Sequence, residues 1–274
     1  MNPMLNIGIR AARAAGKVIT QNVDRYDPLS IQKKQRNDFV TEVDRKAEAE
    51  IVAVLRKAYP DHAFMCEESG LIGDANAEFQ WVIDPLDGTT NFIHGLPHYS
   101  VSIALLQKNR LFQAVVYDPM RQELFTAGKG EGAFLDSKRL RVSRAGRLED
   151  ALLGSGFPYR EGQDLDFYQR TVRHYTERSA GVRRLGSAAL DLAYVAAGRL
   201  EGCWLTGLHS WDIAAGALIV REAGGLVNDF EGGDDWMEKG ELIAAAPKVH
   251  HQMLEVMKPL AAARGRAKTA SKPQ

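Results

Sequence analysis

Two aspartates, Asp84 and Asp87, stand three residues apart at the end of an apolar run that begins at Trp81. An unpaired carboxylate at the end of a buried strand is costly, and a bound cation would remove that cost. The chain continues into Gly88-Thr89-Thr90, a turn that could open a helix and offer free backbone N–H groups to an anion. Carboxylates beside such N–H groups suit a hard cation held against a phosphate. These residue types therefore predict phosphoryl chemistry.

Other acids stand in similarly unusual settings elsewhere in the chain. They lie in Asp38–Asp44, in Glu67-Glu68 and at Asp212, which opens an alanine-rich helix. Helix capping alone would explain Asp44 or Asp212, because a carboxylate at a helix start accepts hydrogen bonds from free N–H groups. Mg²⁺, however, needs several oxygen ligands around one ion, and no histidine or cysteine spacing indicates a softer metal. We therefore expect these acids to meet the first two aspartates around shared Mg²⁺ ions.

The composition is that of an ordinary globular protein. The chain has 274 residues, 45% of them hydrophobic, which is enough for one large domain or two closely packed halves. Lys+Arg and Asp+Glu number 35 each, so net charge implies no general attraction to nucleic acid or an anionic membrane. Cys66 and Cys203 lack the spacing of a zinc site or a disulfide framework. We see no signal peptide or membrane span and expect a cytoplasmic protein.

The first half of the chain reads as helices followed by an antiparallel sheet. Apolar residues at helical spacing predict a helix over about Leu5–Asp24. Thr41 with Asp44 resembles a capping box at the start of a second helix, Thr41–Lys57, which Pro60 closes. The polar stretch Ser30–Asn37 predicts a loop or a short edge hairpin. Short β-rich runs with tight turns then favour antiparallel strands. These runs are Trp81–Ile83, Ser100–Leu106, Phe112–Tyr117 and Glu123–Ala127.

The second half alternates strands and helices, a pattern that predicts a mostly parallel sheet. The expected strands are Ala151–Gly154, Gly202–Leu205, Leu226–Asp229 and Leu242–Ala246. The expected helices are Asp166–Glu177, Ala188–Ala197, Ile213–Ala223 and Val249–Leu260. We expect an N-terminal subdomain over residues 1–145, a C-terminal subdomain over residues 146–262, and a basic, disordered tail over residues 263–274.

Two segments resemble the signatures of a known family. Asp84–Phe92 and Trp211–Gly216 are similar to the two signatures of the inositol monophosphatase family, and further motifs follow the family order. These motifs are Asp38, Thr41 and Asp44, then Glu67-Glu68-Ser69, and then Gly186-Ser187-Ala188-Ala189. The resemblance extends from the first helix to about residue 260. It is strongest to bacterial members of the SuhB type, as in Leu192–Arg199.

The resemblance implies both a fold and an activity. The fold would be a layered αβαβα sandwich of the α/β or α+β class, as in the sugar-phosphatase superfamily and fructose-1,6-bisphosphatase. The activity would be Mg²⁺-dependent hydrolysis of inositol monophosphate or a related small polyol or sugar phosphate. The family also implies two or three Mg²⁺ ions, inhibition by lithium and a homodimer.

The resemblance also assigns metal ligands by position. Glu67, Asp84 and the Leu86 carbonyl would hold one Mg²⁺, and Asp84, Asp87 and Asp212 would hold a second. Glu67 would reach a third, weaker ion through water. Such ions lower the pKa of a bound water and neutralise charge on the transferred phosphoryl group.

Catalytic and substrate-binding residues follow from the same alignment of motifs. Asp44 and Thr89 match the pair that orients and deprotonates the attacking water, and Glu67 would act with them. Substrate binding would fall to residues around the phosphate. These are Asp87, Gly88, Thr89, Ser187, Ala188 and Lys33, the last in a loop that closes over the site in this family.

Two residues depart from the family pattern. Leu205 stands seven residues before Asp212, where members that prefer inositol usually carry a glutamate for the ring hydroxyls. A leucine cannot accept those hydrogen bonds, which puts inositol selectivity in question. Cys66 stands where many members have glycine. It is either a small buried filler or an oxidisable thiol near the metal site.

Two alternatives remain beside the polyol phosphatase. One is a nucleotide 3′-phosphatase. The other is a binding protein of transcription complexes in ribosomal RNA antitermination, with RNA polymerase or transcription factors as partners, since some SuhB-type relatives act in this way. Basic residues would serve such contacts, although a solvated basic face is the simpler explanation. They are Arg139, Arg141, Arg144, Arg183, Arg184 and the cations of the tail.

Overall fold

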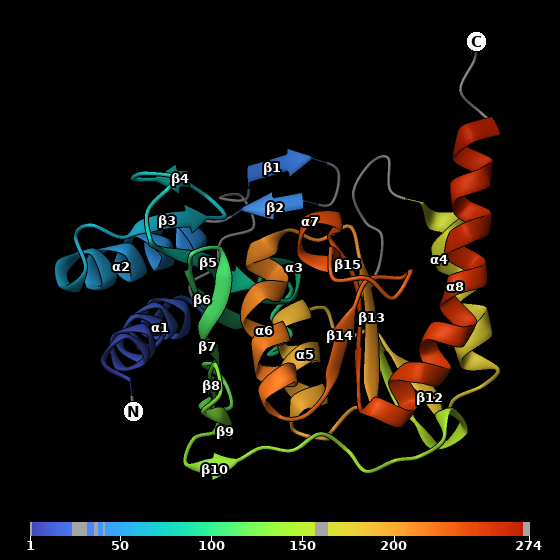
Figure 1. Cartoon of the computed structure of the whole chain (residues 1–274). Helices are drawn as coiled ribbons and strands as arrows, with labels where there is room; N and C mark the ends of the chain where they lie inside the picture. Colours follow the sequence, from blue (N-terminus) through green and yellow to red (C-terminus); the bar gives the residue numbers. More distant parts are fainter. Residues whose placement is uncertain (1, 24–31, 36–37, 41, 157–163, 271–274) are drawn as a thin grey trace.

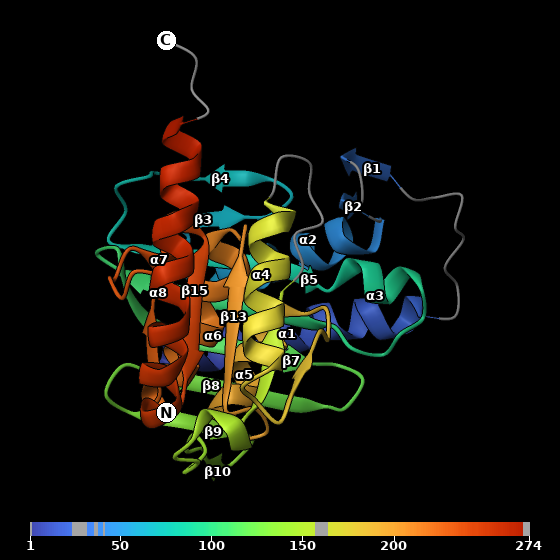
Figure 2. The ribbon, with the colours of Figure 1, turned by 90° about the vertical axis from the view of Figure 1, so that its right-hand side faces the viewer.

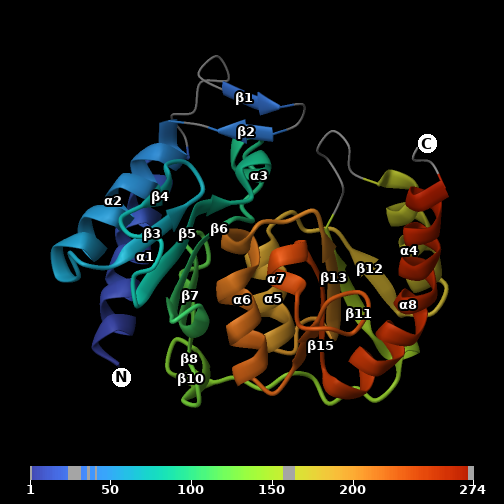
Figure 3. The ribbon, with the colours of Figure 1, turned by 45° about the horizontal axis from the view of Figure 1, so that its top comes forward.

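The computed structural model describes residues 2–270, apart from residues 24–31, 36–37, 41 and 157–163. Helices and sheets stack in five layers, in the order helix, sheet, helix, sheet, helix (Figure 1, Figure 3). The predicted αβαβα sandwich is therefore confirmed. Within the described part, no helix is both long and apolar enough to cross a membrane.

The first layer consists of two amphipathic helices, α1 (Pro3–Asn22) and α2 (Glu42–Ala58), which cover one face of the larger sheet. The Asn2 side chain caps α1 by accepting a hydrogen bond from the Met4 N–H (2.9 Å). The expected cap of α2 at Thr41 lies outside the described residues. Both helices lie where the sequence predicts them, to within a few residues.

The larger sheet holds strands in the order β10-β9-β8-β7-β6-β5-β3-β4. Their bounds are β3 Ala63–Cys66, β4 Gly70–Ile72, β5 Phe79–Asp87, β6 Ser100–Gln107, β7 Arg110–Asp118, β8 Glu123–Gly128, β9 Gly132–Leu135 and β10 Lys138–Arg139. The β3–β5 pair is parallel and the other neighbours are antiparallel, so the antiparallel prediction is confirmed for most of the sheet. The parallel pair aligns the carboxyl ends of β3 and β5.

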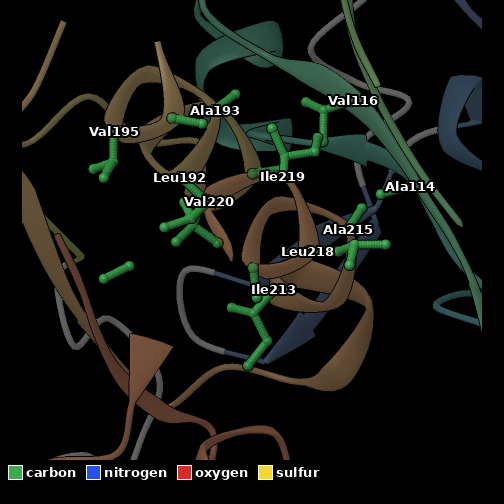
Figure 4. Close-up of a cluster of buried hydrophobic side chains, with 14 of the residues drawn as sticks. Ala114, Val116, Leu192, Ala193, Val195, Ile213, Ala215, Leu218, Ile219 and Val220 are labelled. Carbon is green, nitrogen blue, oxygen red and sulfur yellow. The ribbon is translucent and has the colours of Figure 1, made fainter. Parts of the chain in front are cut away.

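The middle layer consists of α5 (Ala188–Ala196) and α6 (Ser210–Glu222), which lie between the two sheets (Figure 1). A helix that is apolar on nearly all sides is typical of a buried position, and residues 212–220 of α6 are buried throughout. Close packing depends on small residues, since a Cβ at Gly216 would lie 2.5 Å from the Leu192 side chain. Figure 4 shows Leu192, Ile213 and Leu218 within this core.

The smaller sheet has the order β12-β11-β13-β15-β14. Its strands are β11 Leu152–Ser155, β12 Gly181–Arg183, β13 Gly202–Thr206, β14 Leu226–Asn228 and β15 Glu241–Ala245. The expectation of a mostly parallel sheet holds for the directions of β11, β12, β13 and β14, but β15 lies between β13 and β14 and runs antiparallel to both. Between β14 and β15 the chain forms only the short helix α7 (Trp236–Lys239), so it turns back beside β14 instead of crossing over.

The last layer consists of α4 (Leu165–Thr176) and α8 (Pro247–Ala270), which pack side by side on the outer face of the smaller sheet (Figure 2). We expected the final helix to end near Leu260. It continues into the segment expected to be a disordered tail, because that stretch is rich in alanine, lysine and arginine, which favour helix. Residues 271–274 lie outside the described part. The division into subdomains at residue 145 stays a prediction.

Three short elements complete the fold: η2 (Leu148–Asp150), α3 (Thr89–Ile93) and an antiparallel hairpin of β1 (Gln32–Gln35) and β2 (Asp38–Val40). The hairpin agrees with the second of the two alternatives for residues 30–37. Among the described strands it forms a separate sheet. Helix α3 follows β5 directly, at the turn that the sequence singles out.

Candidate active site

Strand β5 carries the two central aspartates. It continues to Asp87, four residues beyond the predicted end at Ile83, and its register against β6 shifts between Asp84 and Asp87. Such an irregularity is where a strand tolerates a proline, here Pro85. The Asp84 Oδ1 accepts a hydrogen bond from the Leu86 N–H (2.9 Å), which fixes the bend. Both aspartates are buried at this end of the strand.

A third aspartate reaches the same place from another layer. Asp212 lies in the first turn of α6, and its Oδ2 accepts a hydrogen bond from the His209 N–H (2.6 Å). One carboxylate oxygen from each of Asp84, Asp87 and Asp212 lies within 4.8 Å of the other two. The structure thus brings together three acids from two segments that are far apart in the sequence.

The charges of these acids oppose one another. Burial raises the pKa of Asp84 well above its usual value, and repulsion from Glu67, Asp87 and Asp212 raises it further. Burial also raises the pKa of Asp87 to about 6, against the opposing effect of hydrogen bonds from Ser187 and Ala189. Three hard oxygen donors so close together fit a divalent cation such as Mg²⁺.

Glu67 joins this group from the end of β3. Its own N–H donates to the Ile83 carbonyl (3.1 Å), and Cys66 pairs with Ile83 across the parallel β3–β5 ladder. Glu67 therefore lies beside Asp84, the residue that follows Ile83. This explains the repulsion that raises the pKa of Asp84.

The expected water-orienting pair is in contact. The Thr89 hydroxyl lies 3.0 Å from the Asp44 Oδ1 and 3.0 Å from the Leu86 carbonyl oxygen. It can donate its single hydrogen bond to either oxygen. Asp44 is buried on α2, although an aspartate at a helix start is usually exposed. The Thr89–Asp44 contact therefore connects α2 to the start of α3.

Gly88 makes the turn between β5 and α3 possible. Its φ angle is +100°, in the left-handed region that side chains disfavour. A Cβ there would also lie 3.1 Å from the His98 carbonyl oxygen and 3.2 Å from that of Gly186. Glycine is therefore required both for the backbone angle and for the close approach of two loops.

The start of α5 holds Asp87. Ser187 caps this helix, and its hydroxyl donates to the Asp87 Oδ2 (2.5 Å), as does the Ala189 N–H (2.7 Å). We expected Ser187 and Ala188 to bind substrate. Both lie at the cavity, but the Ser187 hydroxyl already donates its proton to Asp87.

These residues surround an open cavity. Its lining includes most of the predicted site: Glu67, Asp84, Leu86, Asp87, Gly88, Thr89, Ser187, Ala188 and Asp212. Asp44 contacts the site through Thr89. Only the backbone of Lys33 is described, in β1, so its expected role at the site stays a prediction.

Sequence reasoning missed several residues of this lining. They are Ser155, Gly156, Asp191, Thr206 and Leu208. Asp191 is buried, and its Oδ1 has no hydrogen-bond partner among the described residues. Burial and the charge of Asp87 raise its pKa well above the usual value. An acid within the apolar run of α5 was the available signal.

Arg184 also lies at the cavity. We considered it among the basic residues of a protein-binding surface, but its charge acts within the site, where it lowers the pKa of Asp87 against the effect of burial. A positive side chain beside the acids is also suited to attracting a phosphate.

The two departures from the family pattern have different surroundings. Leu205 is 1% exposed, lies in β13 opposite Leu242 and lines the cavity. Cys66 is fully buried, and burial together with the charge of Glu48 raises the pKa of its thiol to about 12. A buried, protonated thiol is poorly reactive, so the first of the two alternatives, a buried filler, is favoured.

Comparisons with known proteins agree with this geometry. The family model described as "Inositol monophosphatase family" matches residues 1–260. Nus factor SuhB of Pseudomonas aeruginosa is 55% identical over 263 residues, which cover 94% of this chain and 97% of that protein. Two solved structures are also similar to this chain. The crystal structure of extragenic suppressor protein suhB from Bartonella henselae has 42% identity and a TM-score of 0.91, covering 94% of this chain and 99% of the other. Inositol monophosphatase from Anabaena has 35% identity and a TM-score of 0.81, covering 92% and 94%.

Proposed function

Since the chain belongs to the inositol monophosphatase family, we propose that it is a Mg²⁺-dependent phosphomonoesterase that hydrolyses inositol monophosphate or a related small polyol or sugar phosphate. The observation that carries this proposal is the convergence of Asp84, Asp87 and Asp212 within 4.8 Å at one cavity. Acids that repel one another in a buried place are stabilised only by protons or a cation.

The ligand assignment of the family fits the residues present. Glu67, Asp84 and the Leu86 carbonyl would hold one Mg²⁺, and Asp84, Asp87 and Asp212 a second, with Glu67 reaching a third through water. When bound, these ions lower the pKa of water and neutralise phosphoryl charge. The hydrogen bonds from Ser187 and Ala189 hold Asp87 in one orientation, as ligands of a metal require.

The remaining site residues would handle the proton and the phosphate. Thr89 lies within hydrogen-bond distance of Asp44, so a proton that Thr89 accepts from a water can pass to the Asp44 carboxylate. Gly88 and Thr89 offer backbone N–H groups at the cavity, and Arg184 adds a positive charge there. Leu205 and Leu208 give the cavity an apolar wall.

Metal removal tests the activity directly. Phosphate release from inositol 1-phosphate, glycerol 2-phosphate, sugar phosphates and adenosine 3′-phosphate should require Mg²⁺, stop on chelation, and return when Mg²⁺ is restored, because the acids alone repel a phosphate. Lithium should inhibit the same reaction. Release that is unaffected by chelation would contradict the metal assignment. Preference for the nucleotide would instead support the 3′-phosphatase alternative.

A substitution at Leu205 tests whether this part of the cavity contacts the substrate. Leu205→Glu should raise the kcat/KM for inositol 1-phosphate relative to glycerol 2-phosphate by about ten-fold, because a carboxylate at this position can accept hydrogen bonds from ring hydroxyls. Steady-state kinetics of both substrates measure the ratio. Leu205→Ala is the control for the loss of the leucine, and the melting temperature shows whether the variant folds. An unchanged ratio in a folded Leu205→Glu protein means that this position does not contact substrate.

A second function is favoured by the relatives. Nus factor SuhB of Pseudomonas aeruginosa shares 55% identity with this chain over nearly the full length of both. We therefore also propose that the chain binds transcription complexes, with RNA polymerase or transcription factors as partners, alongside its catalysis. The homodimer and the cytoplasmic location expected from the sequence stay predictions.

A further inference from the structure

Helix α2 carries two buried carboxylates four residues apart, Asp44 and Glu48, on its sheet-facing side. Residues at this spacing project from the same face of a helix. Asp44 accepts from Thr89, as described above. Glu48 contacts a different part of the site, and neither the sequence motifs nor the proposed chemistry accounts for it.

Glu48 is 3% exposed, and each of its two carboxylate oxygens accepts a hydrogen bond. Its Oε2 accepts a hydrogen bond from the Glu68 N–H (2.8 Å), and its Oε1 accepts one from the Ser69 hydroxyl (2.5 Å). These donors belong to the two residues that directly follow Glu67. Glu48 does not line the cavity around Asp84, and these two hydrogen bonds connect it to the residues beside Glu67.

The backbone on both sides of Glu67 is therefore fixed. On one side, Cys66 is paired to β5, and the Glu67 N–H donates to the Ile83 carbonyl. On the other side, the turn is held to α2 by the two bonds to Glu48. β3 ends at Cys66 and β4 begins at Gly70, so residues 67–69 have no strand pairing of their own.

We propose that Glu48 is a positioning residue of the metal centre: it holds the Glu68-Ser69 turn against α2 so that the Glu67 carboxylate faces Asp84. Helix α2 also carries Asp44, which contacts Thr89. The same helix therefore fixes the positions of Glu67 and Thr89 relative to each other. The inference rests on the proposed function, since it assumes that Glu67 and Asp84 share a cation. Residues that orient metal ligands typically change metal affinity when they are replaced.

The test measures cation binding separately from catalysis. Mn²⁺ binding is followed through the electron paramagnetic resonance signal of the free ion, and Mg²⁺ activation through phosphate release. Glu48→Ala removes both hydrogen bonds and should weaken Mn²⁺ binding, and raise the Mg²⁺ concentration for half-maximal activity, by about ten-fold. At saturating Mg²⁺ most of kcat should return.

The conservative variant separates positioning from charge. Glu48→Gln keeps both contacts, because its amide oxygen accepts from the Glu68 N–H and its NH₂ group donates to the Ser69 oxygen, so affinity should stay within about three-fold of wild type. If Glu48 acted through its charge, glutamine would weaken binding as much as alanine. Glu50→Ala makes the same charge change at an exposed position of α2 and should leave binding unchanged.

Ser69→Ala keeps the test decisive if Glu48→Ala does not fold. It removes one of the two bonds, and an intermediate loss of Mn²⁺ affinity with an unchanged melting temperature supports the proposal. Wild-type affinity in folded Glu48→Ala overturns the proposal, and if Glu48→Ala does not fold, wild-type affinity in Ser69→Ala overturns it. A wild-type protein that neither binds Mn²⁺ nor releases phosphate would instead refute the proposed function.

Discussion

Asp84→Asn should reduce Mg²⁺-dependent phosphate release by about 10³-fold or more, which corresponds to about 4 kcal/mol of transition-state stabilisation. Asp84 is buried between Glu67, Asp87 and Asp212, so it is the one acid placed to contact both proposed cations. An amide of the same shape removes the charge while keeping an oxygen for the Leu86 N–H. Phosphate release at saturating substrate and a range of Mg²⁺ concentrations measures the loss.

The same variant should not lose stability when a chelator is present. Burial and three neighbouring acids raise the pKa of Asp84, so its charged form costs folding free energy at neutral pH. The melting temperature of Asp84→Asn should therefore equal or exceed that of wild type at pH 7. The difference should shrink as the pH falls, because Asp84 in the wild-type protein then binds a proton in the folded state.

Two further measurements accompany Asp84→Asn: phosphate release by a control variant, and a pull-down that tests partner binding. Asp166→Asn makes the same change at an exposed position of α4 and should leave phosphate release unchanged. Wild-type rates in Asp84→Asn would refute the metal assignment. If the binding to transcription complexes is independent of catalysis, a pull-down with RNA polymerase and transcription factors should recover the same partners with wild type and with Asp84→Asn.

Thr89→Ala should lower kcat by about 10²- to 10³-fold while Mn²⁺ binding stays close to wild type, because it removes the hydroxyl that connects the cavity to Asp44 without removing a carboxylate. Steady-state kinetics at saturating Mg²⁺ give kcat, and the paramagnetic resonance signal of free Mn²⁺ gives the affinity.

Serine is the matched control for Thr89. Thr89→Ser keeps the hydroxyl, so it should retain most of the activity, and the difference between serine and alanine isolates the contribution of that group. Equal activity of the two variants would mean that the Thr89 hydroxyl takes no part in proton transfer. A large loss of Mn²⁺ affinity in Thr89→Ala would place the effect in the metal centre through the Leu86 carbonyl instead.

The positions of the main helices could be predicted from the sequence because they depend on local spacing. Apolar residues at a period near 3.6 predicted α1, and the capping pattern at Thr41 with Pro60 predicted α2, each to within a few residues. The direction of β15 could not be found in this way. Strand direction depends on which neighbours pair with the strand, and β15 inserts between β14, the strand just before it, and β13, whose residues lie roughly forty positions earlier in the chain.

The candidate site, too, could be predicted from the sequence only in part. The pairing of Asp84 with Asp87 before Gly88 pointed to phosphoryl chemistry from residue types alone. The two hydrogen bonds that Glu48 accepts and the place of Arg184 in the cavity had no sequence signal, since an acid on a helix and a basic pair are most often solvated.

The sequence by itself determined which donors this protein has: hard oxygen ligands, a glycine for a left-handed turn, and a hydroxyl next to it. Residue type and local backbone geometry are enough for that, because both act over a few neighbouring residues. Only the tertiary structure decided which donors meet. Thr89 reaches Asp44 across 45 residues, and Ser187 reaches Asp87 across 100. Those contacts follow from the stacking of α2, β5, α5 and α6, since the packing of layers alone fixes the distance between residues so far apart in the chain.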